Sequence, residues 1–207
     1  MLDYEQKIYK KGYSLVVGCD EAGRGPLCGP VVCACCILPP DYKNDQINDS
    51  KKLSEKKREE LFEEIKRVAL YYQVVSIEPE EIDRINIYEA SRKGMTEAIL
   101  KCGVTPDYIL TDCMPLFGFD KIPQENLVKG DAKALCIAAA SILAKVTRDH
   151  IMLEIDQKYP QYLIRKHKGY PTKEHIELLN KYGPIKGLYR YSYKPVIDSL
   201  NVQLKLF

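Results

Sequence analysis

The chain has 207 residues, of which 45% are hydrophobic and 29% are charged, and its formal net charge is +2. This composition is typical of a globular protein and excludes collagen-like and disordered chains, while a nearly neutral chain binds nucleic acid only through a local basic face. No apolar run approaches the roughly 20 residues of a membrane helix, and no signal peptide is evident. We therefore expect a cytoplasmic monomer without a membrane partner, whose eight cysteines are reduced thiols.

The first third of the chain is expected to form two strands and a helix. The apolar runs at residues 15–20 and 29–38 predict buried strands, and the Gly-Pro-rich residues 23–29 predict the turn between them. Strands this close in the sequence indicate an antiparallel hairpin. Ser54 fits the N-cap of a helix that ends at about Arg67, with Leu61, Phe62 and Ile65 facing the core.

The middle of the chain alternates between strand and helix patterns. We expect strands at residues 71–77, 107–112 and 126–129 and a helix at residues 87–101. Three early strands followed by alternating helices and strands indicate an α/β layer fold with a mixed sheet.

The strongest helical pattern covers residues 130–159, which is long enough to allow a bend or break. At about 100° per residue, Asp131, Ser141, Lys145 and Arg148 share one face of this helix, beside an apolar stripe. We interpret this face as one that receives a backbone phosphate. The alternative is that Lys145 and Arg148 are ordinary solvated charges.

Four acids lie at the ends of predicted elements. Asp20 and Glu21 end the first strand, Asp112 ends a later strand, and Asp131 begins the long helix. Neighbouring carboxylates repel one another unless a cation is close, and hard oxygen ligands favour Mg²⁺ or Mn²⁺. If the two strands are neighbours, the acids converge where sites of α/β folds cluster. Each acid alone also fits an ordinary role as a cap or turn residue, so the interpretation depends on the set.

A glycine-rich segment follows the first acid pair. Gly23, Arg24 and Gly25, which we call the Gly-Arg-Gly loop, combine a mobile backbone with a planar cation suited to phosphate. The spacing is not that of a dinucleotide-binding fingerprint, and no Walker A sequence occurs. Cys19 and Cys113 adjoin the acids without a nucleophile motif, and a zinc site is not indicated. Together the loop and the acids indicate phosphate-ester chemistry at a metal.

Several longer motifs run through the chain, at residues 18–31, 49–54, 129–131, 137–149 and 167–170. In sequence and in order they resemble the motifs of the ribonuclease HII family. The resemblance implies an RNase H-like mixed sheet flanked by helices over residues 1–160, and a C-terminal helical substrate-binding region over residues 161–207. It also implies an endonuclease that cuts the RNA strand of RNA–DNA hybrids. Such an enzyme would also incise ribonucleotide-containing duplex DNA 5′ of a single ribonucleotide, leaving 3′-hydroxyl and 5′-phosphate ends.

The same resemblance implies roles for individual residues. The family's metal-binding acids, which would hold Mg²⁺ or Mn²⁺, are matched by Asp20, Glu21, Asp112 and Asp131. The loop that reads the ribose 2′-hydroxyl and the adjacent phosphate is matched by Gly23, Arg24 and Gly25, and the tyrosine at the RNA–DNA junction by Tyr170. Segments that resemble phosphate-binding ones contain or adjoin Lys51, Ser141, Lys145 and Arg148.

The C-terminal part departs from the family pattern. The chain reads Arg190-Tyr191-Ser192-Tyr193 where the family commonly has Arg-Arg-Ser-Phe, and one arginine fewer predicts a weaker phosphate contact. Residues 203–207 are suggestive of a tail that docks on a sliding clamp, with an apolar last helical turn as the alternative. Two other functions stay open at this point: a non-catalytic module that binds RNA–DNA junctions, and a metal nuclease that acts on DNA alone.

Overall fold

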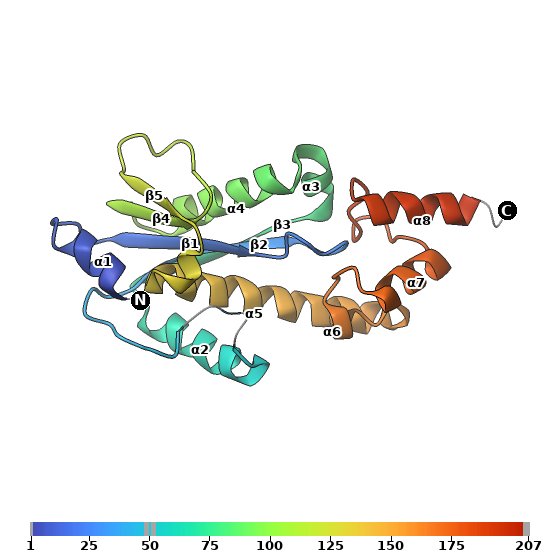
Figure 1. Ribbon diagram of the computed structural model, residues 1–207, viewed down its shortest axis with the longest axis horizontal. Helices are drawn as coiled ribbons and strands as arrows, with labels where there is room; N and C mark the ends of the chain where they lie inside the picture. The colour runs from blue at the N-terminus through green and yellow to red at the C-terminus, as the bar shows by residue number, and fades with distance from the viewer. Residues whose placement is uncertain (1, 48–49, 51–52, 205–207) are drawn as a thin grey trace.

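The computed structural model describes residues 2–47, 50 and 53–204, and its centre is a five-stranded sheet in the order β3-β2-β1-β4-β5 (Figure 1). The strands are β1 (Val16–Ala22), β2 (Val31–Ile37), β3 (Tyr71–Ile77), β4 (Tyr108–Asp112) and β5 (Gln124–Leu127). The helices are α1 (Leu2–Tyr9), α2 (Glu55–Val68), α3 (Pro79–Ile85), α4 (Ile87–Lys101), α5 (Leu135–Lys158), α6 (Ile164–His167), α7 (Lys173–Tyr182) and α8 (Lys194–Leu204). Two 3₁₀ turns, η1 (Gly130–Ala132) and η2 (Pro160–Tyr162), flank α5.

The sheet is mixed, as predicted. β1, β2 and β3 pair in an antiparallel manner, whereas β1, β4 and β5 run parallel. Helix α4 covers one face of the sheet and α5 the other, with α2 packed outside α5 (Figure 1). The α/β layer fold and the early hairpin are therefore confirmed. No helix in the described part of the chain is long and apolar enough to cross a membrane.

The sequence predicted the position of α2 correctly from its N-cap and its apolar pattern. The Ser54 side chain accepts a hydrogen bond from the Lys57 N–H and so caps the helix, as expected for a serine that precedes a helical pattern. Leu61 and Ile65 are buried against α5, while Phe62 is only partly covered. The predicted core face of this helix is thus confirmed, and its amphipathic pattern explains where it packs.

Two predicted elements are displaced in the structure. The strand predicted at residues 126–129 is β5, two residues earlier, because Lys129 adopts a left-handed conformation with φ 57° and turns the chain out of the sheet. The helix predicted from residue 130 starts at Leu135, because residues 130–132 form the separate turn η1 and Ala134 is extended, with ψ 130°. The break lies beside the predicted acid Asp131 and sets it apart from α5.

The close approach of β1 to α5 depends on a glycine. A Cβ atom on Gly18 would lie 2.3 Å from the carbonyl carbon of Cys136, in the first turn of α5. Only a residue without a side chain lets the strand and the helix backbone pack at this distance. The contact places the first half of β1 directly over the start of α5.

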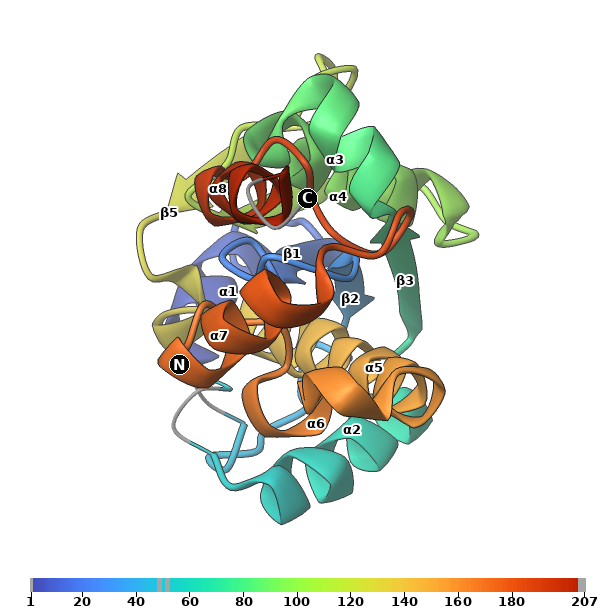
Figure 2. The same ribbon diagram turned by 90° about the vertical axis from the view of Figure 1, so that its right-hand side faces the viewer.

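The C-terminal helices pack on the loop between β1 and β2. Figure 2 faces this end of the molecule, with α6, α7 and α8 in front of the sheet. A hydrophobic cluster joins these helices to the loop and to α5. Its buried members are Leu27, Cys28, Met152, Tyr162, Ile164, Leu179, Leu188, Tyr189 and Val196. Backbone hydrogen bonds also run from Leu27 N to Gly169 O and from Gly29 N to Leu188 O. The predicted division of the chain near residue 160 stays a prediction.

Helix α1, which was not predicted, caps α5. Ala134 at the N-cap has no side chain that can accept a hydrogen bond, and Oε1 of Glu5 instead accepts the N–H of Cys136 at 2.9 Å. Glu5 is buried, and this burial raises the pKa of its carboxyl group, although hydrogen bonds from the α5 backbone counteract part of the effect. A neutral acceptor would satisfy the same N–H without a buried charge.

We expect Glu5→Gln to gain stability relative to the native chain as the pH rises. Folding raises the pKa of the Glu5 carboxyl group, because the folded state disfavours its ionised form. The native chain therefore loses free energy of unfolding as the pH rises from the ordinary pKa of this group to its higher folded pKa. Urea unfolding from pH 4 to pH 8 measures this difference in the free energy of unfolding. Glu63→Gln, at an exposed position on α2, is the control; a Glu5→Gln difference that stays constant with pH would contradict the expectation.

Candidate active site

Parallel pairing brings the predicted acids to one edge of the sheet. β1 and β4 are in register with Cys19 opposite Thr111, so Asp20 on β1 and Asp112 at the end of β4 lie one residue further along neighbouring strands. β1 continues to Ala22, so Asp20 lies within the strand and not at its predicted end. Asp112 Oδ1 accepts the N–H of Gly130 at 2.8 Å, which holds the start of η1, and with it Asp131, at the same edge. Glu21 follows Asp20 on β1.

Asp20 lies in an environment that disfavours its negative charge. The residue is only 6% exposed, and this burial, followed by the charge of Glu21, raises the pKa of its carboxyl group well above the ordinary value, with Asp112 acting in the same direction. Hydrogen bonds from the Ser141 hydroxyl and the Glu21 N–H lower the pKa only in part. A cation at this edge would offset the repulsion among the acids.

The donor set fits a hard divalent cation. All four predicted ligands are carboxylates, which suit Mg²⁺ or Mn²⁺. Among the described residues, no three His, Cys, Asp or Glu side chains lie close enough to hold an ion as they stand. Backbone N–H groups hold the carboxylates of Asp20 and Asp112 in this arrangement.

The Gly-Arg-Gly loop lies between these acids and Tyr170. The guanidinium Nη1 of Arg24 is 3.3 Å from Oε1 of Glu21, and the Arg24 side chain is otherwise largely exposed. On the other side, a Cβ atom on Gly25 would lie 3.5 Å from Cε1 of the Tyr170 ring. Tyr170 is 43% exposed, so its ring is accessible at the surface. The structure therefore brings the acids, the loop and the tyrosine together on one surface.

Two other predicted contact residues, Ser141 and Lys145, lie on α5. Ser141 is buried, with its Oγ 3.0 Å from Oγ of Ser50, and it hydrogen-bonds Asp20, so its position suits support of that acid. Lys145 extends to Asp149, with Nζ 2.8 Å from Oδ1, and keeps part of its side chain accessible. Lys51 lies outside the described residues.

Arg148 does not occupy the surface that the helical wheel suggested. It is 1% exposed, and its guanidinium donates to the carbonyl groups of Pro30 at 3.1 Å, Cys28 at 3.2 Å and Lys168 at 3.0 Å. Burial, with the charge of Arg190 nearby, lowers the pKa of Arg148 to about 10, so the side chain stays charged near neutral pH. This position fits neither a phosphate contact nor a solvated charge. The helical periodicity could not predict the burial of Arg148, because the segments that cover its side chain come from distant parts of the sequence.

Sequence reasoning missed the supports of the loop and of Tyr170. Arg190 is 0% exposed and donates to backbone carbonyls of the loop region. His175 Nδ1 is 2.9 Å from the Tyr170 carbonyl oxygen, and its ring stacks on that of His167 with centroids 4.1 Å apart. The positions of these residues in the sequence carry no periodic signal. Only the motif at residues 167–170 indicated that this part of the chain belongs to the site.

These features define a ribonuclease H-like nuclease fold, and comparisons with known proteins identify the family. The family model of ribonuclease HII matches residues 17–196. A ribonuclease HII of Desulfitobacterium hafniense is 47% identical over 202 residues, which cover 98% of this chain and 77% of that protein. The ribonuclease H2 structure from Pyrococcus horikoshii superposes with a TM-score of 0.77 at 26% identity, covering 91% of this chain and 98% of the other.

A second solved structure is titled as the PCNA:RNase HII complex from Archaeoglobus fulgidus. It has a TM-score of 0.70 and 28% identity, and the match covers 87% of this chain and 95% of that one. The chain belongs to the ribonuclease HII family. It is accordingly a ribonuclease H endonuclease that acts on the RNA strand of RNA–DNA hybrids.

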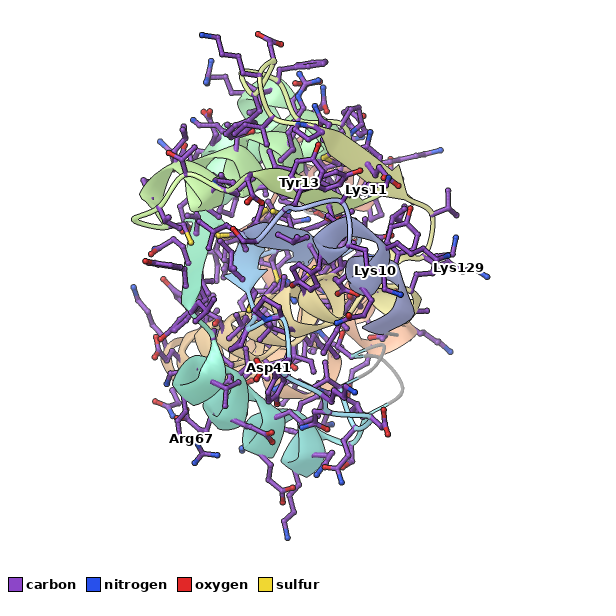
Figure 3. All side chains as sticks on the ribbon, turned by 90° about the vertical axis from the view of Figure 1, so that its left-hand side faces the viewer. Lys10, Lys11, Tyr13, Asp41, Arg67 and Lys129 are labelled. Carbon is purple, nitrogen blue, oxygen red and sulfur yellow. The ribbon has the colours of Figure 1, made fainter. Side chains whose placement is uncertain are left out.

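We expect Arg148→Lys to destabilise the fold by about 2–4 kcal/mol, because a lysine cannot reach three separated carbonyl groups and leaves buried acceptors unsatisfied. Urea unfolding measures the loss. The matched control is Arg67→Lys on α2, where the side chain projects from the surface in Figure 3 and little change is expected. Equal stabilities of the two variants would show that Arg148 is not a structural residue.

Proposed function

We propose that this enzyme incises duplex DNA on the 5′ side of a single embedded ribonucleotide, as well as cutting longer hybrids, and leaves 3′-hydroxyl and 5′-phosphate ends. The observation that carries the proposal is the juxtaposition of the acids, the Gly-Arg-Gly loop and Tyr170 on one surface. The acids supply a place for phosphodiester chemistry, and the loop supplies a backbone close enough to examine a ribose.

The proposed metal ligands are Asp20, Glu21, Asp112 and Asp131. Divalent cations held there, Mg²⁺ or Mn²⁺, would activate the attacking water and stabilise the leaving 3′-oxygen. The protein's own part is to keep carboxylates from three chain segments at one edge. Ser141 contributes by hydrogen bonding to Asp20, which favours the ionised form that a cation requires.

Recognition of the ribose is assigned to backbone groups. The 2′-hydroxyl is the local group that distinguishes RNA from DNA, and a glycine backbone can approach it without a side chain in the way. Gly23 has φ +102°, and a Cβ atom there would lie 2.1 Å from Nε of Arg148, so both conformation and space require glycine. The exposed guanidinium of Arg24 is then available to the adjacent phosphate, and Lys145 to a phosphate further along.

Tyr170 is proposed to test the nucleotide beside the ribose. An exposed phenol ring offers a flat apolar face to a sugar or base and a hydroxyl for hydrogen bonding. His175 and His167 hold the backbone at this point through contacts with Tyr170 and its neighbours. The ring is therefore exposed on a supported segment.

A sliding clamp is proposed as a protein partner. The solved relative in a PCNA complex supports this proposal, and residues 203–207 are the predicted docking tail, of which 205–207 lie outside the described residues. Cytoplasmic location and the monomeric state stay predictions. The non-catalytic alternative loses its support, since the chain belongs to an enzyme family and carries all four acids.

We expect the enzyme with Mn²⁺ or Mg²⁺ to cut a hybrid and a duplex with one ribonucleotide, and to leave the all-DNA duplex intact. Asp112→Asn should reduce cleavage at least about 100-fold, because an amide is a weaker metal ligand, while hybrid binding stays largely intact. Gel analysis of end-labelled duplexes measures cleavage, and fluorescence anisotropy measures binding.

The matched control is Asp120→Asn, an exposed acid in the segment between β4 and β5, which should cut normally. Near-normal turnover by Asp112→Asn would contradict the proposed metal-dependent mechanism. Cleavage of the all-DNA duplex at a similar rate would favour the DNA nuclease alternative.

We expect Tyr170→Phe to stay within about threefold of the native activity on the single-ribonucleotide duplex, whereas Tyr170→Ala loses about tenfold or more, the range of one aromatic stacking contact. The measurement is kcat/KM for each variant. Equal losses in both variants would assign the contact to the hydroxyl group instead of the ring.

A further inference from the structure

The carbonyl groups of the Gly-Arg-Gly loop are held from inside the protein. Arg190 donates from Nη2 to Gly23 O at 2.7 Å and from Nη1 to Arg24 O at 3.0 Å. Its Nε also donates to Gly29 O at 3.1 Å, at the far end of the same turn. One buried guanidinium therefore spans both ends of a turn that would otherwise be flexible because of its glycines.

Tyr193 adds a second donor to the same loop. Its hydroxyl donates to Arg24 O at 2.7 Å and accepts a hydrogen bond from Nη1 of Arg190 at 3.1 Å. The ring lies beside the guanidinium, with 5.3 Å between the Arg190 Cζ atom and the ring centroid. Arg24 O is therefore bound by two side chains from residues 190–193.

That C-terminal segment is itself anchored to the main body. The carboxylate of Asp83, on α3, accepts the N–H groups of Tyr191 at 2.8 Å and Ser192 at 2.9 Å. It also accepts the Ser192 hydroxyl at 2.6 Å. Since α3 packs on α4, which covers the sheet, the donors of Arg190 and Tyr193 have a fixed position relative to the acids.

The orientation of these carbonyls has a consequence for the N–H groups. In a planar trans peptide, the N–H of one residue points opposite to the carbonyl of the residue before it. No peptide bond in the described part of the chain is cis. Because Gly23 O and Arg24 O face the guanidinium of Arg190, the N–H groups of Arg24 and Gly25 point away from it. Fixed donors of this kind suit an oxygen acceptor.

We propose that Tyr193, acting with Arg190, is a positioning residue that sets the Gly-Arg-Gly backbone for substrate recognition without touching the substrate. The inference rests on the proposed role of this loop in reading the ribose. Tyr193 acts through the carbonyl oxygen of Arg24. The hydrogen bond from the Tyr193 hydroxyl holds the peptide between Arg24 and Gly25 in one orientation. Without it, that peptide is held by Arg190 alone.

The test compares Tyr193→Phe with Tyr191→Phe. Both remove one hydroxyl from the same segment, but the Tyr191 hydroxyl donates to Pro184 O at 3.1 Å and not to the loop. We expect Tyr193→Phe to raise KM for a single-ribonucleotide duplex about three- to tenfold, the effect of one neutral hydrogen bond, with kcat within about twofold. Tyr191→Phe should keep both constants.

Amide hydrogen exchange of the free protein separates positioning from direct contact. In Tyr193→Phe, with no nucleic acid present, exchange at Arg24 and Gly25 should become faster, while the melting temperature stays close to that of Tyr191→Phe. A raised KM with unchanged exchange would mean that Tyr193 contacts the substrate itself. Unchanged KM, with or without faster exchange, would equally overturn the proposal.

Gly25→Ala separates failure of this inference from failure of the proposed loop function. Its methyl group would point at the Tyr170 ring, 3.5 Å away, and should raise KM if the loop meets the substrate. If Gly25→Ala raises KM and Tyr193→Phe does not, the positioning role alone is wrong. If neither variant changes KM, the loop is not the recognition element and both proposals fail.

Discussion

The burial of Asp20 beside other carboxylates is the constraint on which the active-site region depends. A buried acid next to acids is unstable on its own, as its raised pKa indicates, and the surrounding structure keeps it in place. The contact of Gly18 with α5 places Asp20 over the helix, and Ser141 on that helix donates to it. Parallel pairing with β4 adds Asp112. The scaffold therefore holds mutually repelling carboxylates together, an arrangement that fits the proposed cation site.

A second structural principle is the use of buried arginines as backbone clamps. Arg148 and Arg190 are both inaccessible, and each donates to several carbonyl groups in the turn that connects β1 to β2. A guanidinium has five donors in a rigid plane, so it can satisfy several carbonyls of an irregular segment at once. Each arginine comes from a different part of the chain. The turn is consequently held on two sides, although its own sequence favours mobility.

The C-terminal helices complete the site. The segment between α6 and α7 carries Tyr170, which His175 on α7 supports, and the segment between α7 and α8 supplies Arg190 and Tyr193 to the loop. Burial lowers the pKa of His175 to about 4, so this support is neutral at physiological pH and adds no charge near the substrate surface. The acids are thus provided by the sheet and η1, whereas the elements proposed to recognise the ribose are held by the last quarter of the chain. The proposed metal ligands and the proposed recognition elements meet at the turn after β1.

The sequence by itself determined the elements that local patterns encode. Apolar runs, a Gly-Pro-rich turn and capping predicted the hairpin and α2, and the order of strands and helices predicted the mixed sheet. The predicted positions of Asp20, Glu21, Asp112 and Asp131 at element ends pointed to a cation site. Only the tertiary structure decided the register that aligns β1 with β4, the break before α5, and the burial of Arg148 and Arg190. These features depend on residues up to 167 positions apart, such as Gly23 and Arg190. Helical periodicity and short motifs each describe one segment of the chain. They cannot show which segments from elsewhere in the sequence will cover a charged side chain.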